Sequence, residues 1–108
     1  MDSNIKEKIL KGEEYSYFDK ELNNLRTECK FKCFQYNYTL KEKQKEFIKT
    51  IINVKTDNYY INKKFDCHFG KNIFIGDNFY SSFNLTIIDE NFVIFGDNIY
   101  IYRVKLYF

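Results

Sequence analysis

The chain has 108 residues, so its length indicates a single domain with a modest hydrophobic core. Its formal net charge is +2 and its lysines are interleaved with acidic residues, which argues against nucleic acid or an anionic membrane as a partner. The opening MDSNIKEKIL carries charges where a signal peptide would be apolar, and no apolar run reaches the length of about 18 residues that a membrane helix needs. We therefore expect a soluble, cytoplasmic protein.

Residues 1–55 show the period of amphipathic helices. Ile5 and Ile9 lie about one turn apart and predict a short helix near the N-terminus. A longer helix follows, with Asp19 placed to cap its N-terminus. Its apolar stripe recurs at steps of three and four residues and consists of Leu22, Leu25, Cys29, Cys33 and Tyr36.

A further helix is predicted to begin near Thr39. Thr39 and Glu42 have the spacing of a capping box, in which each side chain binds a free backbone N–H of the first helical turn. One apolar face follows, made by Phe47, Ile48, Ile51 and Ile52. Because each helix has a single apolar face, the helices need another element to pack against.

The three cysteines of the sequence are Cys29, Cys33 and Cys67. An odd number of cysteines without an export signal argues for reduced thiols. Cys29 and Cys33 lie one helical turn apart and could form a metal site with Cys67 and His68. Their place on the apolar stripe favours small core residues instead, so we predict no metal.

Residues 56–108 lose the helical period and are rich in β-branched and aromatic side chains. Segments such as NIFIG, NLTII and NFVIFG are separated by Gly-Asp-Asn and Gly-Lys-Asn, which are typical turn sequences. This part of the chain is therefore predicted to form short strands joined by tight turns.

The turns recur at regular intervals. In FGKNIFIGDNF, residues 69–79, Gly70 and Gly76 lie six positions apart, and two asparagines keep the same spacing. The unit returns in FGDNIY, residues 95–100, where Gly96 lies twenty positions after Gly76. Such hexads indicate a parallel β-helix with about 18 residues in each three-sided coil, plus two in a corner. Antiparallel hairpins with Gly-Asp-Asn turns fit the same spacing, which leaves both arrangements open.

The order of segments KEKILKGEEY, FDKELNNLR, FQYNYT and FDCHFGKNIFIGDNFYSSFNLTIIDENFVIFGDNI resembles the maltose and galactoside O-acetyltransferases of the hexapeptide-repeat superfamily. The resemblance runs from about Lys6 to Ile101. It implies an α+β fold in which a helical leader, residues 1–55, packs on the first coils of a left-handed parallel β-helix, residues 56–108. It also implies a homotrimer that transfers an acetyl group from acetyl-CoA to a hydroxyl group of a sugar acceptor.

The reaction that the resemblance implies uses a histidine as general base on the acceptor hydroxyl. In the family this histidine lies about one coil beyond the second IGDN unit, whereas here YRVKLYF follows Ile101. His68, the one histidine of the sequence, does not match that position. We therefore expect a truncated, inactive form: a solenoid cut after about two coils, without a catalytic residue and without productive binding of acetyl-CoA. The alternative is a non-catalytic module that pairs with itself or with a full-length relative.

The predicted substrate-binding residues are Tyr80, Asn84 and Asp89, which match the family pattern Y..FN.TI.D near the acceptor pocket. Ser82 stands where relatives often have an asparagine that contacts the substrate. A coil corner with ordinary packing explains Tyr80 and Asn84 equally well. For Asp89, a role in a turn is favoured over contact with the sugar.

Overall fold

The structure is a computed structural model that describes residues 19–102 and 105–108. The helix predicted around Ile5 and Ile9 lies outside these residues. Helical segments come first in the described chain, and they are α2 (Lys20–Asn37), α3 (Lys41–Phe47) and the 3₁₀ helix η1 (Ile48–Thr50). Neither α-helix is long and apolar enough to cross a membrane.

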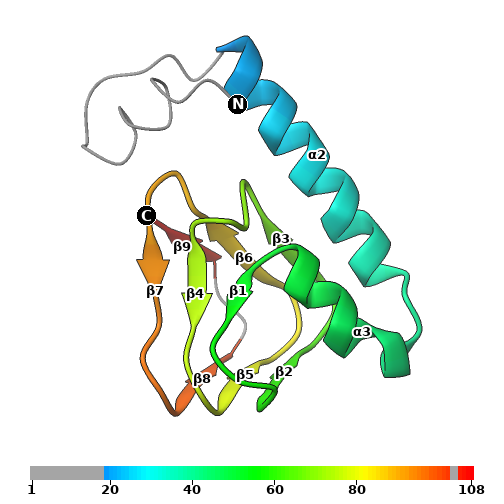
Figure 1. Cartoon of the computed structure of the whole chain (residues 1–108), viewed down its shortest axis with the longest axis vertical. Helices are drawn as coiled ribbons and strands as arrows, with labels where there is room; N and C mark the ends of the chain where they lie inside the picture. The colour runs from blue at the N-terminus through cyan, green and yellow to red at the C-terminus, as the bar shows by residue number, and fades with distance from the viewer. Residues whose placement is uncertain (1–18, 103–104) are drawn as a thin grey trace.

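The rest of the described chain forms short strands. In chain order these are β1 (Asn53–Val54), β2 (Tyr59–Ile61), β3 (Phe65–Cys67), β4 (Ile73–Ile75), β5 (Phe79–Ser81), β6 (Leu85–Ile88), β7 (Val93–Ile94), β8 (Ile99–Ile101) and β9 (Lys105–Tyr107). They form three parallel sheets with the orders β1-β4-β7, β2-β5-β8 and β3-β6-β9. Each sheet is one side of a three-sided coil, and the strands stack coil upon coil (Figure 1).

The register gives the length of a coil. Phe79 pairs with Tyr59 in the preceding coil and with Ile99 in the next, a step of twenty residues in each direction. Parallel pairing at this step excludes the antiparallel hairpins that the spacing had left open. It confirms the predicted fold class, a helical leader followed by part of a left-handed parallel β-helix.

The side chains inside the coils form the core. Strands β2, β3 and β4 each bury their first and third residues and expose the second, because successive side chains of a strand point to opposite faces. The fully buried side chains include Phe65, Ile73, Leu85 and Ile87. Burying one such side chain contributes about 1.5–3 kcal/mol, so stacked coils stabilise each other mainly through this interior.

Asparagines occupy corners with left-handed backbone. Asn78, Asn84 and Asn98 have φ angles of 57°, 63° and 59°, and Gly70 has 75°. Asparagine and glycine tolerate this conformation better than other residues. The side chains of Asn78 and Asn98 stack between coils, since Asn78 Nδ2 donates to Asn98 Oδ1 at 3.0 Å.

The leader packs along one side of the coils, where α2 contacts β3 (Figure 1). Asp19 is the N-cap of α2, as predicted: its Oδ1 accepts hydrogen bonds from the backbone N–H groups of Glu21 and Leu22 at 2.9 and 3.2 Å. The helix buries Leu22, Cys29, Cys33 and Tyr36, whereas Leu25 of the predicted stripe is only partly buried.

The capping box predicted at Thr39 is wrong. Helix α3 begins at Lys41 with Leu40 as its N-cap, and no side chain caps it. The Thr39 hydroxyl instead donates to the Gln35 carbonyl at 2.6 Å, because it lies within reach of the last turn of α2. Helix α3 also ends earlier than predicted, and Ile51, which follows η1, is buried where the chain turns into β1.

The coils continue further than expected. The sequence suggested about two coils, but β7, β8 and β9 add a third strand to every sheet. Strand β9 pairs in parallel with β6, with Leu106 opposite Ile87. Strand β9 therefore extends the solenoid, even though the sequence between β8 and β9 lacks the glycine and asparagine of the earlier corners.

Candidate functional site

A pocket of about 370 Å³ lies between α2 and the sheet that contains β3 and β6. We call it the α2 pocket. Its lining consists of Asn23, Arg26, Thr27, Lys30, Asp66, Cys67, His68, Thr86 and Ile88. Polar and charged side chains of the leader thus face polar side chains of the first two coils, an arrangement suited to a ligand rich in hydroxyl groups.

Glu90 links two of the lining residues. Arg26 Nη2 donates to Glu90 Oε1 at 2.7 Å, and His68 Nδ1 lies 3.4 Å from Glu90 Oε2. All three side chains are largely buried, with exposed fractions between 10% and 24%. The Arg26 guanidinium also lies over the ring of Phe69, 5.2 Å from its centre. The imidazole is therefore held beside a carboxylate and away from bulk solvent.

Asp89 supports the corner that carries His68. Its carboxylate is completely buried, and its Oδ1 accepts hydrogen bonds from the N–H groups of His68 and Phe69 at 2.9 and 3.0 Å. Its Oδ2 accepts from the Gly70 N–H at 2.8 Å. Burial raises the pKa of the Asp89 carboxyl, while the three N–H donors favour its charged form. Both oxygens thus face the preceding coil. Contact of Asp89 with a substrate stays a prediction.

Tyr80 lies on the outer side of β5 in a column of aromatic rings. Its ring centre is 6.1 Å from that of Tyr60, 6.5 Å from that of Tyr100 and 6.2 Å from that of Tyr102. The Tyr80 hydroxyl accepts a hydrogen bond from Asn62 Nδ2 at 3.4 Å. The column gives one side of the coils an aromatic surface that is partly open to solvent.

Asn84 is exposed in the corner between β5 and β6. Tyr80 precedes this corner, and Asp89 directly follows β6 and begins the next corner, so the three predicted residues belong to successive sides and corners of one coil. None of the three lines the α2 pocket. The structure therefore does not gather them into one cavity of this chain, and their roles in binding stay predictions.

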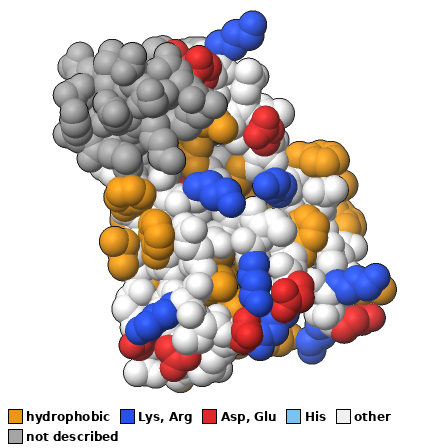
Figure 2. Space-filling view, in the orientation of Figure 1, with side chains coloured by type: hydrophobic (Ala, Val, Ile, Leu, Met, Phe, Trp, Pro, Cys, Tyr) orange, Lys and Arg blue, Asp and Glu red, His pale blue; other side chains and the backbone are white. Residues whose placement is uncertain are grey.

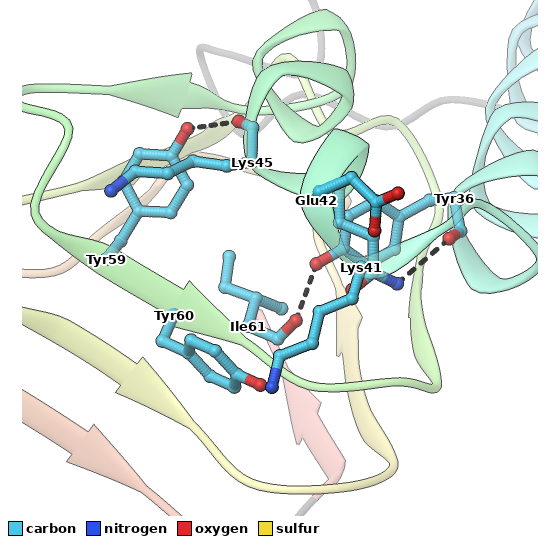
Figure 3. A pocket seen from close by; sticks show the side chains of 8 residues that line it. Tyr36, Lys41, Glu42, Lys45, Tyr59, Tyr60 and Ile61 are labelled. Atoms are coloured by element: carbon cyan, nitrogen blue, oxygen red, sulfur yellow. Dashed lines mark hydrogen bonds between the residues drawn. The ribbon is translucent and has the colours of Figure 1, made fainter.

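A second pocket, of about 440 Å³, opens between α3 and β2 (Figure 3). Tyr36 lines this pocket, and its hydroxyl donates a hydrogen bond to the Ile61 carbonyl at 2.5 Å. Lys41 reaches over the ring of Tyr60, 5.5 Å from its centre, and the Tyr59 hydroxyl donates to the carbonyl of Lys45. The sequence pattern did not predict this pocket, because its lysines and tyrosines belong to separate elements that meet only in the fold.

The comparisons with known proteins agree with this architecture. Residues 8–54 match the maltose acetyltransferase hexapeptide capping motif. A Saccharomyces cerevisiae protein assigned to the acetyltransferases is 40% identical over 102 residues, which are 90% of this chain and 52% of that protein. A maltose O-acetyltransferase of Clostridium difficile has a similar structure, with a TM-score of 0.84, 28% identity and coverage of 94% of this chain and 57% of that one. The chain belongs to the maltose and galactoside O-acetyltransferase family.

A galactoside acetyltransferase in complex with coenzyme A has a similar structure to this family member, with a TM-score of 0.81 and 30% identity. It is matched over 94% of this chain and 53% of that one. The chain spans about half the length of the curated relatives it matches. The matched part contains the leader and the first coils, which together form the α2 pocket.

Sequence reasoning missed Arg26 and Glu90 of this site. Arg26 stands in the leader segment FDKELNNLR, and Glu90 directly follows Asp89, but 64 positions separate them. Only the packing of α2 on the coils brings them together. His68, which does not match the family's position for the base, has a side chain that is 24% exposed beside Glu90.

Proposed function

We propose that this chain forms the acceptor-binding part of a cytoplasmic sugar O-acetyltransferase that uses acetyl-CoA as donor. The observation that carries the proposal is the shared architecture of leader and coils, which matches a maltose O-acetyltransferase and a galactoside acetyltransferase with bound coenzyme A over 94% of the chain. The α2 pocket supports it, because paired charged groups such as Arg26 and Glu90 can donate to and accept from sugar hydroxyls.

In this proposal Tyr80 and Asn84 contact the acceptor from the outer side of the coil. The Tyr80 ring offers an apolar face and its hydroxyl a polar end, a combination that suits a sugar ring. Asp89 acts by holding the backbone at His68 through its three hydrogen bonds. Tyr80 and Asn84 do not line the α2 pocket of their own chain, so the proposal needs a homotrimer in which they reach the acceptor bound at the α2 pocket of a neighbouring chain.

The reaction proposed for the family member is direct acyl transfer. The acceptor hydroxyl attacks the thioester carbonyl, its proton passes to a general base, and the thiolate of coenzyme A leaves. His68 is held in the α2 pocket beside Glu90 and does not occupy the family's position for the base. We therefore propose that the 108-residue chain by itself does not turn over and that it does not bind acetyl-CoA productively.

Two measurements on the 108-residue chain test this function. Transfer of radiolabelled acetyl from acetyl-CoA to maltose or a galactoside should stay at background, and saturation-transfer NMR should detect binding of the same sugars. Tyr80→Ala should abolish sugar binding, whereas the matched variant Tyr107→Ala, at an exposed tyrosine far along the chain, should retain it. Turnover above background would refute the proposed inactivity. Absence of sugar binding would refute the acceptor role.

A second function, a non-catalytic interaction module, is favoured by the exposed third coil. Large apolar side chains on β7, β8 and β9 are exposed: the exposed fraction is 75% for Ile94, 55% for Tyr100 and 69% for Tyr107. Figure 2 shows hydrophobic side chains gathered over the β7 side of the molecule. Surfaces of this kind mark contacts with other chains. Sedimentation analysis should then give a stable oligomer, or a complex with a full-length relative, and a monomer in both experiments would refute this function.

A further inference from the structure

The three cysteines meet at the junction of the leader and the first coil. Cys29 and Cys33 lie one turn apart on the buried face of α2, and Cys67 is the last residue of β3. The Sγ atom of Cys67 lies 3.4 Å from that of Cys29 and 3.8 Å from that of Cys33, and all three sulfur atoms lie within 4.8 Å of one another. All three are free thiols with exposed fractions of 5%, 0% and 6%.

This triangle has nearly the size that a metal ion requires. A cation bound at about 2.3 Å from each of three thiolates in one plane sets the sulfur atoms about 4 Å apart. The observed separations of 3.4 and 3.8 Å are shorter than this by about 0.6 and 0.2 Å, and the third is at most 4.8 Å, so the sulfur atoms need to move by less than 1 Å. The three sulfur atoms thus lie close enough together for one ion to contact all of them.

The donor set indicates which ion would bind. The group contains sulfur atoms alone, and in the described part of the chain no histidine, aspartate or glutamate joins it. Soft thiolate ligands select Cu(I) and Zn(II), but structural zinc sites take four ligands. Three buried sulfurs without a fourth donor therefore suit Cu(I) better.

We propose that Cys29, Cys33 and Cys67 form a three-sulfur binding site for Cu(I). Copper keeps its oxidation state on binding, and each thiol that becomes a thiolate releases its proton to solvent. Cys67 lines the α2 pocket, which gives the ion a path from solvent.

The bound ion would join α2 to β3 and so fasten the leader to the first coil. Two of its ligands come from the helix and one from the strand, so separation of the two elements would break Cu–S bonds. An ion that binds the folded state stabilises it by mass action. Copper should therefore raise the thermal midpoint of unfolding.

The test is an anaerobic titration of the reduced 108-residue chain with Cu(I) in competition with a Cu(I) chelator. We expect one Cu(I) per chain, with three sulfur neighbours at about 2.3 Å in X-ray absorption. Cys33→Ser should lower the affinity for Cu(I) by roughly 100-fold or more. Loss of a hydrogen-bond partner of a metal ligand can already cost roughly 100-fold, and here a ligand itself is lost. Cys29→Ser and Cys67→Ser should do the same, and the thermal midpoint should rise with copper in the parent chain alone.

Two results would overturn the proposal. Copper binding by the triple serine variant as tight as that of the parent chain would place the ion elsewhere, and tighter competition by Zn(II) than by Cu(I) would refute the choice of ion. If the serine variants do not fold, X-ray absorption of the parent chain with one equivalent of Cu(I) decides. Three sulfur neighbours would support the site, whereas oxygen or nitrogen neighbours would mean that the cysteines only fill the core.

Discussion

Replacement of Asp89 by asparagine removes charge from a buried side chain without changing its shape. The carboxylate accepts three backbone hydrogen bonds, from His68, Phe69 and Gly70, at 2.8–3.0 Å. In Asp89→Asn, one oxygen can still accept from two of these groups, but an NH₂ group replaces the other oxygen. That NH₂ group would face a backbone N–H, so two donors would point at each other in a buried corner.

The expected loss follows from these contacts. A buried donor without a partner costs about 1–3 kcal/mol, and hydrogen bonds to charged groups contribute about 1.5–3 kcal/mol each. We therefore expect Asp89→Asn to lower the free energy of unfolding by about 2–4 kcal/mol, and Asp89→Ala to lower it further. For a chain of this size, such a loss is a large part of the total stability.

Urea unfolding followed by circular dichroism measures this loss. The matched control is Asp97→Asn, because Asp97 makes a similar bond to the N–H of Asp77, one coil earlier, at 2.7 Å. Asp97 is exposed, so water can replace its contact and the change should be much smaller. Equal losses for the two variants, or no loss for Asp89→Asn, would refute the argument that burial gives the Asp89 contacts their strength.

Three further variants test single features of the fold. Asn84→Ala should lower the free energy of unfolding in urea by about 1 kcal/mol, because alanine is strained at a φ angle of 63°. Asn84→Gly should lower it little, and equal losses for the two variants would contradict this reason. Burial raises the pKa of Tyr36, so the stability that its neutral phenol contributes is complete below about pH 10 and falls at higher pH. The free energy of unfolding of Tyr36→Phe, measured relative to that of the parent chain, should therefore rise by about 1.4 kcal/mol between pH 8 and pH 11. A difference that does not change with pH would contradict this reasoning. Ile94→Lys should lower the sedimentation mass if the third coil mediates association, and an unchanged oligomer would exclude this surface.

Local signals in the sequence predicted those parts of the fold that depend on neighbouring residues. Asp19 caps α2 because its partners lie two and three positions away. The glycine and asparagine spacing predicted the coils because these residues recur where a corner needs a left-handed backbone conformation. The capping box at Thr39 failed because α3 begins at Lys41 with Leu40 as its N-cap, which leaves Thr39 one residue too early to cap it. The Thr39 hydroxyl donates to the end of α2 instead.

The α2 pocket and the sulfur triangle could not be predicted in the same way. The pair of Arg26 and Glu90 joins a helix of the leader to the corner after β6. Cys67 reaches Cys29 across 38 positions of sequence. In both cases the rotation of α2 on the coils decides which side chains meet, and the helical period alone does not determine that rotation.

A third group of contacts is neither local nor dependent on how α2 packs on the coils. These contacts follow the repeat of twenty residues and can be predicted once the fold is known. Asp89 binds backbone groups 19 to 21 positions earlier, and Asp97 binds Asp77 twenty positions earlier. Both carboxylates bind the corner one coil before their own, so an acidic residue about one coil after a glycine corner is the signal to seek. Because each corner depends on a residue from the next coil, the sequence of one coil does not by itself determine its stability.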